Sequence, residues 1–348
     1  MSVASQTESR NVDRILAFTR DAIEKKVKDS HFNHSPLLAA LAGELLGEFG
    51  RGSMAGRAKR VQSGGESIVV RVNLGANTGA KRKSGPWDTN NTAPSDTVRY
   101  ARANWRFIAC PVTLSDHDLR VNTGPEAISS LMEHEVTQGY RSTGEIVASD
   151  AYENNGVAAA ITDLDSIVSS AGETAAVQGL SGATYADWNS RGVTARGTAP
   201  ASITFPSGSF AAQGLDDMRI AFNNASEGSM VPQAVYCGWL PYGYYEGSLQ
   251  PQERFTNTAI ADAGFMQLAF KSAPVFPDAY IPDGATTGRM YFLNFDCLEY
   301  VVLSGADFAM GDFVRVENQS ARVAQVEVTA QLCVKARKFL NKLTTISA

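Results

Sequence analysis

Side chains that commonly carry catalysis or bind metals are few and scattered in this sequence. Its 348 residues include only four histidines and four cysteines. The cysteines form no CxxC pair and lie beside apolar or aromatic residues, which favours buried free thiols over disulfides or metal ligands. They are Cys110, Cys237, Cys297 and Cys333. His31 and His34 could share a helix face, but no cysteine or carboxylate cluster accompanies them. We therefore predict no metal site and no cofactor.

One glycine-rich segment resembles part of a nucleotide-binding loop. Gly75 to Arg82 has the first glycine and the lysine of a phosphate-binding loop at the right separation. Ala80, however, replaces the second glycine, Arg82 replaces the hydroxyl residue that would hold Mg²⁺, and Pro86 opposes the helix that must follow. The sequence also has no nucleophile–base motif and no Gly-x-Ser-x-Gly turn. We therefore expect that the protein is not an enzyme.

The same lysine belongs to the tip of a predicted hairpin. Residues 66–74 and 97–115 alternate apolar and polar side chains as strands do, and about twenty turn-forming residues separate them. The tip, residues 79–88, contains Lys81, Arg82 and Lys83 and also Trp87. We expect it to be loose, with an ordered strand base. An irregular loop of this length is unusual in a compact domain, which favours a functional or intermolecular role.

The longest predicted element is a helix from Thr123 to Asn155. Residues 122–124 supply its cap, and apolar residues then recur at steps of three and four. At ~1.5 Å per residue it would be a rod of roughly 40 Å. Gly139 and Gly144 interrupt it, so we expect a bend or the close approach of another backbone there. The opposite face carries acidic side chains, among them Glu133, Glu135 and Glu145.

Two helices are predicted before the hairpin. Residues 10–29 are amphipathic, whereas residues 37–49 are apolar nearly all round. A helix of the second kind must be covered by its own domain or by a partner, and we expect residues 36–49 to be ordered only in an assembly. Residues 50–65, rich in Gly, Ser, Arg and Lys, are predicted to be a flexible link.

The second half of the chain mixes helices and strands without a βαβ repeat, which predicts an α+β fold. Helices are expected at 161–170 and 215–225, and a long strand at 321–334, followed by a cationic tail over residues 335–342. Shorter strands are expected at 231–237, 264–270, 290–293, 300–303 and 314–316.

Charge is unevenly distributed along the chain. The net charge is −5, but residues 1–120 and 313–348 together carry +10 while residues 121–312 carry −15. We expect basic extensions to contact acidic bodies, including those of neighbouring copies. The sequence contains no run of ~18 apolar residues, so no membrane partner is expected. Residues 1–13 lack the apolar core of a secretion signal.

The order of these elements resembles the major capsid proteins of tailed bacteriophages, the Johnson fold, over about residues 35–343. No single motif is specific, but the collinear set is. It comprises Gly64-Gly65 with the strand that follows, Trp87-Asp88, residues 100–105 and 111–115, residues 122–124, residues 185–188, residues 251–255 and residues 290–294.

This resemblance implies a division of the chain into the parts of a shell subunit. They would be an N-terminal arm at 1–60, an E-loop hairpin at 61–120, a P-domain with its spine helix at 121–212, an A-domain at 213–312, and the P-domain return strand and C-terminus at 313–348. No separate N-terminal scaffold domain is visible in the sequence.

The resemblance also implies a function. The chain would be the structural subunit of an icosahedral bacteriophage capsid, forming pentamers and hexamers around double-stranded DNA in the virion after assembly in the host bacterial cytoplasm. A portal, and possibly scaffolding or decoration proteins, would be further partners. Two alternatives stay open: an encapsulin-like nanocompartment that encloses protein cargo, and another phage structural subunit of the tail or baseplate.

Several residues are candidates for contact between subunits. We expect the tip to lie on a neighbour near its spine helix, with Trp87 supplying apolar area. Basic tip residues and acidic spine residues would pair, and apolar residues of the 37–49 helix would add surface. The candidates are Lys81, Arg82, Lys83, Trp87, Glu133, Glu135, Glu145, Leu41, Leu45 and Phe49. Some members of the family cross-link an E-loop lysine to an asparagine beside a carboxylate. Lys81 or Lys83 with Asn318 and Glu317 would imitate that pattern, but charged lysines in water disfavour the reaction.

Overall fold

The structure is a computed structural model, and its chain divides into two compact units, each described by itself. Of the described residues, the first unit contains 107–147 and 302–330, and the second contains the remainder. The described residues are 35–42, 56–77, 79–89, 93–121, 131–154, 156–168, 176–190, 202–204, 210–249, 268–283, 288–317 and 319–346.

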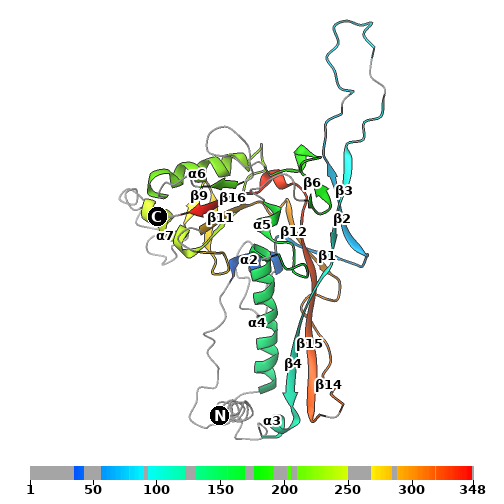
Figure 1. Cartoon of the computed structure of the whole chain (residues 1–348), viewed down its shortest axis with the longest axis vertical. Coiled ribbons are helices and arrows are strands. Elements are labelled where there is room, and N and C mark those ends of the chain that lie inside the picture. Colours follow the sequence, from blue (N-terminus) through cyan, green and yellow to red (C-terminus); the bar gives the residue numbers. More distant parts are fainter. Residues whose placement is uncertain are drawn as a thin grey trace. The chain divides into compact units, whose positions relative to one another are not determined.

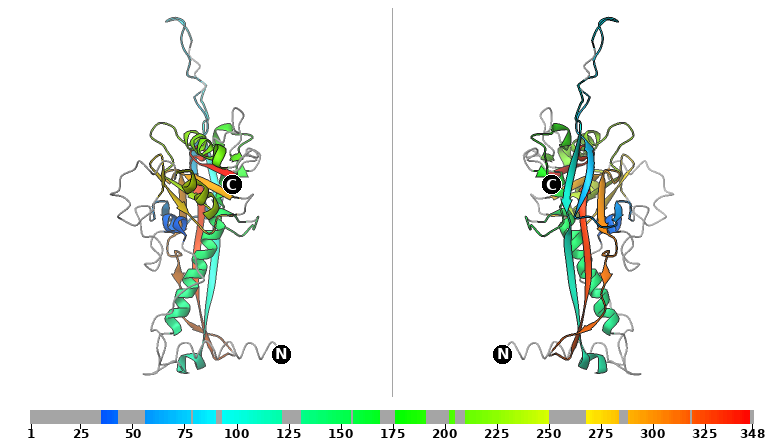
Figure 2. Two further views of the ribbon diagram at one scale, coloured as in Figure 1. Left: turned by 90° about the vertical axis from the view of Figure 1, so that its left-hand side faces the viewer. Right: turned by 90° about the vertical axis from the view of Figure 1, so that its right-hand side faces the viewer.

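In the first unit a long helix lies along a ribbon of long strands (Figures 1 and 2). Strand β15 (Ala321–Val334) pairs with β4 (Arg106–Ser115) and with the short β13 (Ala309–Met310) and β14 (Val314–Arg315). Helix α3 (Asp116–Val121) follows β4, and the Asp116 carboxylate accepts a hydrogen bond of 3.1 Å from Arg322 Nε on β15. The expected long strand at 321–334 is confirmed.

Helix α4 (Leu131–Tyr152) is the described part of the expected spine helix, whose first residues, 123–130, lie outside the described residues. At Gly139 this helix lies close to the strands. A β-carbon there would lie 2.7 Å from Val112 of β4 and 3.6 Å from Val326 of β15. The missing side chain therefore lets the helix approach the sheet, which is one of the two roles expected of this glycine.

The second unit is built on a six-stranded sheet in the order β7-β16-β11-β8-β10-β9. Helices α6 and α7 cover one face, where Phe210, Met218 and Tyr245 pack with Val235 and Phe292 of the sheet. Tyr236 and Tyr291 alternate with those strand residues and so point to the opposite face. The elements are β7 (Ser202–Thr204), α6 (Phe210–Asn224), β8 (Ala234–Cys237), α7 (Trp239–Leu249), β9 (Ala269–Phe270), β10 (Ala273–Pro277), β11 (Gly288–Leu293) and β16 (Asn341–Ile346).

Smaller elements complete the second unit. Strand β12 (Leu298–Leu303) pairs with β1 (Lys59–Gln62) and β15, and strands β5 (Ala176–Val177) and β6 (Leu180–Ser181) form a short hairpin. The remaining elements are α2 (Pro36–Ala42), α5 (Leu164–Ile167), η1 (Ala186–Trp188) and η3 (Arg337–Phe339).

The structure differs from two expectations, one about the strand at residues 97–115 and one about the C-terminal tail. Residues 97–115 are not one strand, because the strand ends at Asn104 and a second strand begins at Arg106. The two strands have different partners. β3 (Val98–Asn104) pairs with β2 (Ser67–Asn73), whereas β4 pairs with β15. Only β2 and β3 form the hairpin. The expected cationic tail, residues 335–342, does not extend to its last residues as a tail, because residues 341 and 342 begin β16, which pairs with β11 and β7 inside the sheet. Burial of Leu343 and Ile346 against α6 is the physical reason.

Candidate assembly surface

The paired strands of the hairpin have one buried and one exposed face. They align from Ser67 opposite Asn104 to Asn73 opposite Val98. Ile68, Val70 and Ala101 are buried, whereas the opposite face exposes Tyr100 by 56%. Val69, Arg71, Val98 and Arg102 share that exposed face. A mixed face of this kind is suited to contact with another surface, since a purely solvated face would carry few large apolar side chains.

Two glutamines attach the hairpin base to the rest of the second unit. Gln331, almost fully buried, donates from Nε2 to Asn104 O at 3.1 Å and accepts from Thr162 N at 2.8 Å. Gln178, at a positive φ of 51° in the β5–β6 turn, accepts from Arg102 N at 2.8 Å through its backbone oxygen. Its side-chain amide pairs with the backbone of β15 at residue 334. The base of the hairpin is therefore fixed by buried hydrogen bonds rather than by apolar packing alone.

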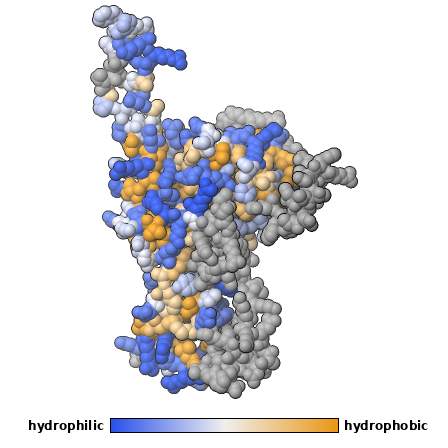
Figure 3. Space-filling model, turned by 180° about the vertical axis from the view of Figure 1, so that it is seen from behind, coloured by the Kyte–Doolittle hydropathy of each residue, from blue (hydrophilic) through white to orange (hydrophobic). Residues whose placement is uncertain are grey.

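The tip contains hydrogen bonds among its own polar groups, and the expectation that it is loose stays a prediction. Asn77 closes a turn by accepting from Gly79 N at 2.8 Å. Lys81 Nζ lies 2.9 Å from Asp88 Oδ1, and Asp88 Oδ2 accepts from Ser84 N at 3.4 Å. The loop extends away from β2 and β3 in Figure 1, and its surface is largely hydrophilic at the top of Figure 3. Lys81 therefore has a partner within its own loop.

The other tip candidates are accessible to a partner. Trp87 is 94% exposed, and Arg82 and Lys83 are exposed as well. Among the acidic candidates on α4, Glu133 is exposed and Glu135 and Glu145 are half-buried. Their pairing with the tip of another copy stays a prediction. Leu45, Phe49 and Asn318 lie outside the described residues, so the expectation that Lys81 or Lys83 is not cross-linked to Asn318 stays a prediction as well.

A buried carboxylate holds the start of helix α2. Asp278, at the end of β10, accepts from Ser35 Oγ at 2.6 Å and from Tyr152 OH at 2.9 Å. The backbone N–H groups of Leu37, at 3.5 Å, and Tyr280, at 3.1 Å, donate to the same carboxylate. Burial raises the pKa of Asp278, and these hydrogen bonds oppose the rise. Asp278 therefore joins the N-terminal segment, the end of α4 and the sheet.

Helix α2 is covered by its own chain, which corrects part of the expectation for residues 36–49. Leu37 and Leu41 are fully buried and Leu38 nearly so. Leu41 thus has no exposed surface with which to contact a neighbouring copy in this conformation. The sequence pattern allowed cover by the chain's own domain or by a partner, and the structure gives the first for this helix.

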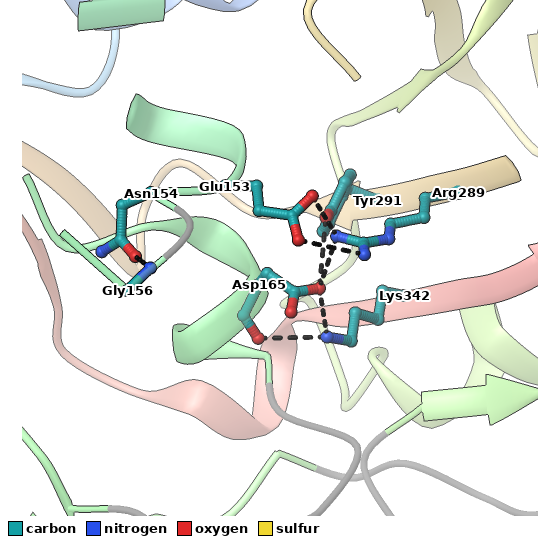
Figure 4. A network of polar contacts seen from close by, with 7 residues as sticks. All are labelled: Glu153, Asn154, Gly156, Asp165, Arg289, Tyr291 and Lys342. Carbon is teal, nitrogen blue, oxygen red and sulfur yellow. Dashed lines mark hydrogen bonds and ion pairs between the residues drawn. The ribbon is translucent and has the colours of Figure 1, made fainter. Parts of the chain in front are cut away.

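A second polar network lies among α4, α5, β11 and β16 (Figure 4). The ammonium group of Lys342, which is almost fully buried, donates to Asp165 Oδ1 at 2.6 Å and to Asp165 O at 3.0 Å. Arg289 bridges Asp165 at 3.1 Å and Glu153 at 3.2 Å, and Tyr291 OH donates to Asp165 at 3.5 Å. Burial lowers the pKa of Lys342, and Asp165 opposes that change. The two anions and two cations of this network balance, as is needed when ion pairs are buried.

Within the described part of the chain, no group of three or more His, Cys, Asp or Glu residues is arranged to hold a metal ion. None of the described helices is long and apolar enough to cross a membrane. Neither polar network was found by sequence reasoning, because Ser35 and Asp278 are 243 positions apart and Asp165 and Lys342 are 177 apart. Lys81 and Asp88 are only seven apart, and opposite charges flanking Gly85-Pro86 were the signal that could have indicated their pair.

The sequence and the structure were compared with those of known proteins. No family model and no curated protein matches the sequence. The capsid asymmetric unit of cyanophage A-1(L) is similar in structure, with a TM-score of 0.64 at 16% identity, covering 94% of this chain and 96% of that chain. The capsid of Myoviridae phage XM1 gives 0.54 at 10% identity over 97% and 98%. The SrpI encapsulin of Synechococcus elongatus gives 0.51 at 10% identity over 83% and 85%.

The chain therefore has the fold of bacteriophage capsid proteins, which encapsulins share. The expected α+β Johnson fold is confirmed.

Proposed function

We propose that this chain is the structural subunit of an icosahedral bacteriophage capsid, which self-assembles into pentamers and hexamers that enclose double-stranded DNA. The observation that carries the proposal is the likeness to a cyanophage capsid, which spans 94% of this chain and 96% of the other. A likeness of nearly full length leaves little of the chain for a separate catalytic domain, so the role is structural rather than enzymatic. The higher TM-score with that capsid than with the encapsulin favours a phage shell.

The proposal extends to location and partners. The subunit would be part of the virion and would assemble in the host bacterial cytoplasm. A portal would join it, and scaffolding or decoration proteins are further candidate partners. Residues 121–312 carry a net charge of −15. The genome would therefore be held by confinement, because an acidic surface does not neutralise phosphates or release their counterions.

The contact between copies would use the tip of the hairpin. Trp87 would supply apolar area, and Arg82 and Lys83 would face an acidic surface. Their candidate partners on the α4 helix of the neighbouring copy are Glu133, Glu135 and Glu145, and Leu45 and Phe49 would add apolar contact. The support for this is the exposure of the tip together with the opposite charges of the two groups. A single exposed ion pair contributes only ~0–1 kcal/mol, but repetition in every copy multiplies it.

Electron microscopy of the purified protein tests the proposed function. Closed icosahedral particles are expected, and particles recovered from infected cells should contain DNA. Particles filled with protein and no DNA would support the encapsulin-like alternative. Open tubes or plates would instead support a tail or baseplate subunit, and a protein that stays monomeric at all concentrations would refute the proposal.

Charge reversal tests the contact surface. Arg82→Glu and Lys83→Glu should leave the subunit folded but weaken assembly, more so at low salt, where the new repulsion is least screened. Arg120→Glu is a matched control, because it makes the same charge change at an exposed arginine of α3, away from the tip in sequence. Equal defects in Arg82→Glu and Arg120→Glu would assign the effect to net charge rather than to the tip.

A further inference from the structure

The tip exposes one large apolar side chain, Trp87, on a loop whose two sides are joined by an ion pair between Lys81 and Asp88. Trp87 is 94% exposed, compared with 59% for Trp239 and 0% for Trp188. The next residue, Asp88, receives both Lys81 Nζ at 2.9 Å and Ser84 N at 3.4 Å. One carboxylate, immediately beside the tryptophan in sequence, thus binds both the start of the segment at Lys81 and its middle at Ser84.

The backbone of the tip adds further restraint. Asp88 N donates to Gly85 O at 3.2 Å, which closes a turn around Pro86 and Trp87. On the other side Ala80 N donates to Asn77 O at 3.2 Å. A loop restrained in this way loses less conformational entropy when it binds, so more of the contact energy appears as affinity. Exposed tryptophans on restrained loops are typical anchors of interfaces.

The charges within the tip are not equivalent. Lys81 is paired with Asp88, whereas Arg82 and Lys83 are exposed and flank the closed turn. After this internal neutralisation the tip keeps two exposed cations, Arg82 and Lys83, on the same loop as its tryptophan. The surface that fits such a group carries carboxylates, and the acidic residues 121–312 of a second copy offer that charge.

We propose that Lys81 and Asp88 form an internal clamp, which holds the tip so that Trp87 contacts an acidic surface of a second copy of the chain. Lys81 is then a positioning residue that acts through Asp88 and does not itself contact the neighbour. This inference rests on the proposed function, because it needs copies that assemble.

Opposite charge changes distinguish a clamp from a direct contact. If Lys81 paired with a neighbour's carboxylate, Lys81→Met would weaken assembly while Asp88→Ala, which adds net positive charge, would strengthen it. A clamp predicts that both weaken it. We expect each to raise the subunit concentration needed for assembly by roughly threefold to fivefold, as for the loss of an exposed ion pair. Trp87→Ala should raise it by roughly thirtyfold or more, as for an interface anchor.

Two further variants complete the test. The exchange Lys81→Asp with Asp88→Lys keeps the tip's net charge and can restore the pair, so it should recover assembly towards the wild-type concentration. Lys83→Met removes the same charge as Lys81→Met from an exposed position outside the clamp, and its effect should not be corrected by any change at Asp88. An exchange variant as defective as Lys81→Met, or improved assembly of Asp88→Ala, would overturn the proposal.

The clamp can also be measured without assembly. In dissociated subunits, amide hydrogen exchange in a peptide covering residues 79–89 should be several-fold faster in Lys81→Met and Asp88→Ala than in wild type or Lys83→Met. Unchanged exchange in both variants would refute the clamp even if particles form normally. Faster exchange with no wild-type particles would instead refute the proposed function and leave the clamp standing.

Discussion

Replacing Gly139 tests whether the close approach of α4 to the strands stabilises the first unit. An alanine in the middle of a helix normally adds about 1 kcal/mol over glycine. Here the new β-carbon would lie 2.7 Å from Val112 Cγ2, which is 0.7 Å short of the 3.4 Å at which ordinary contact begins. Val112 is buried and β-branched, so its methyl group cannot swing away cheaply. Overpacking of this kind costs about 1–3 kcal/mol.

The two effects oppose each other, and the clash should win. We expect Gly139→Ala to lower the free energy of unfolding by about 0–2 kcal/mol, measured by denaturant unfolding of dissociated subunits. Gly243→Ala is the matched control on α7, because no atom lies within 4 Å of its β-carbon position. That substitution should keep the helix-propensity gain and stabilise by up to about 1 kcal/mol.

A double-mutant cycle assigns the loss to the contact itself. Val112→Ala alone removes buried apolar surface and should cost about 1.5–3 kcal/mol. In Gly139→Ala with Val112→Ala, the new methyl group fills part of that space, so the double variant should be more stable than the sum of the single losses by about 0.5–3 kcal/mol. Equal stabilisation by Gly139→Ala and Gly243→Ala, or strictly additive losses in the cycle, would refute this account of the helix–sheet packing.

Two further predictions concern the buried charges of the second unit. Asp165→Ala should lower the free energy of unfolding by about 3–5 kcal/mol, because it leaves the buried ammonium of Lys342 without its anion. Lys342→Met should lower it far less, because the Asp165 carboxylate keeps its ion pair with Arg289. Equal losses of the two variants in denaturant unfolding would refute this asymmetry. Burial raises the pKa of Asp150, Asp163 and Asp278 in the folded chain, so the folded state binds more protons than the unfolded state. Their contribution to stability is therefore greatest below the ordinary carboxyl pKa, about 3.9, and is lost as pH rises through the raised pKa values. Asp163→Asn should therefore flatten the dependence of the free energy of unfolding on pH above about 4. An unchanged slope in that variant would contradict the prediction.

Local pattern was sufficient to predict most of the regular elements. The alternation of residues 66–74 predicted β2, and that of residues 321–334 predicted β15 with its observed bounds. Steps of three and four along the spine predicted α4 over its described part, Leu131–Tyr152. These predictions succeeded because periods of 2 and 3.6 are properties of the backbone, which a single segment displays whatever it packs against.

Which strands pair, and which side chains are buried, depended on contacts between distant segments that the local sequence pattern does not encode. Nothing around Trp105 indicated that the strand before it joins β2 while the strand after it joins β15. The basic residues 335–342 were expected to form a cationic tail, yet Lys342 is buried beside Asp165 because β16 pairs within the six-stranded sheet. The partner that makes a buried lysine tolerable lies 177 positions away.

The sequence alone therefore determined most of the regular elements, the α+β composition and, through the order of those elements, the capsid fold. Tertiary structure decided which apolar side chains are buried by other parts of the same chain and which stay exposed. Leu41 is buried by its own unit, with Asp278 holding Ser35 at the start of the helix, whereas Trp87 stays in solvent. The physical reason is that burial depends on distant surfaces brought together by folding, while periodicity depends only on neighbours along the chain.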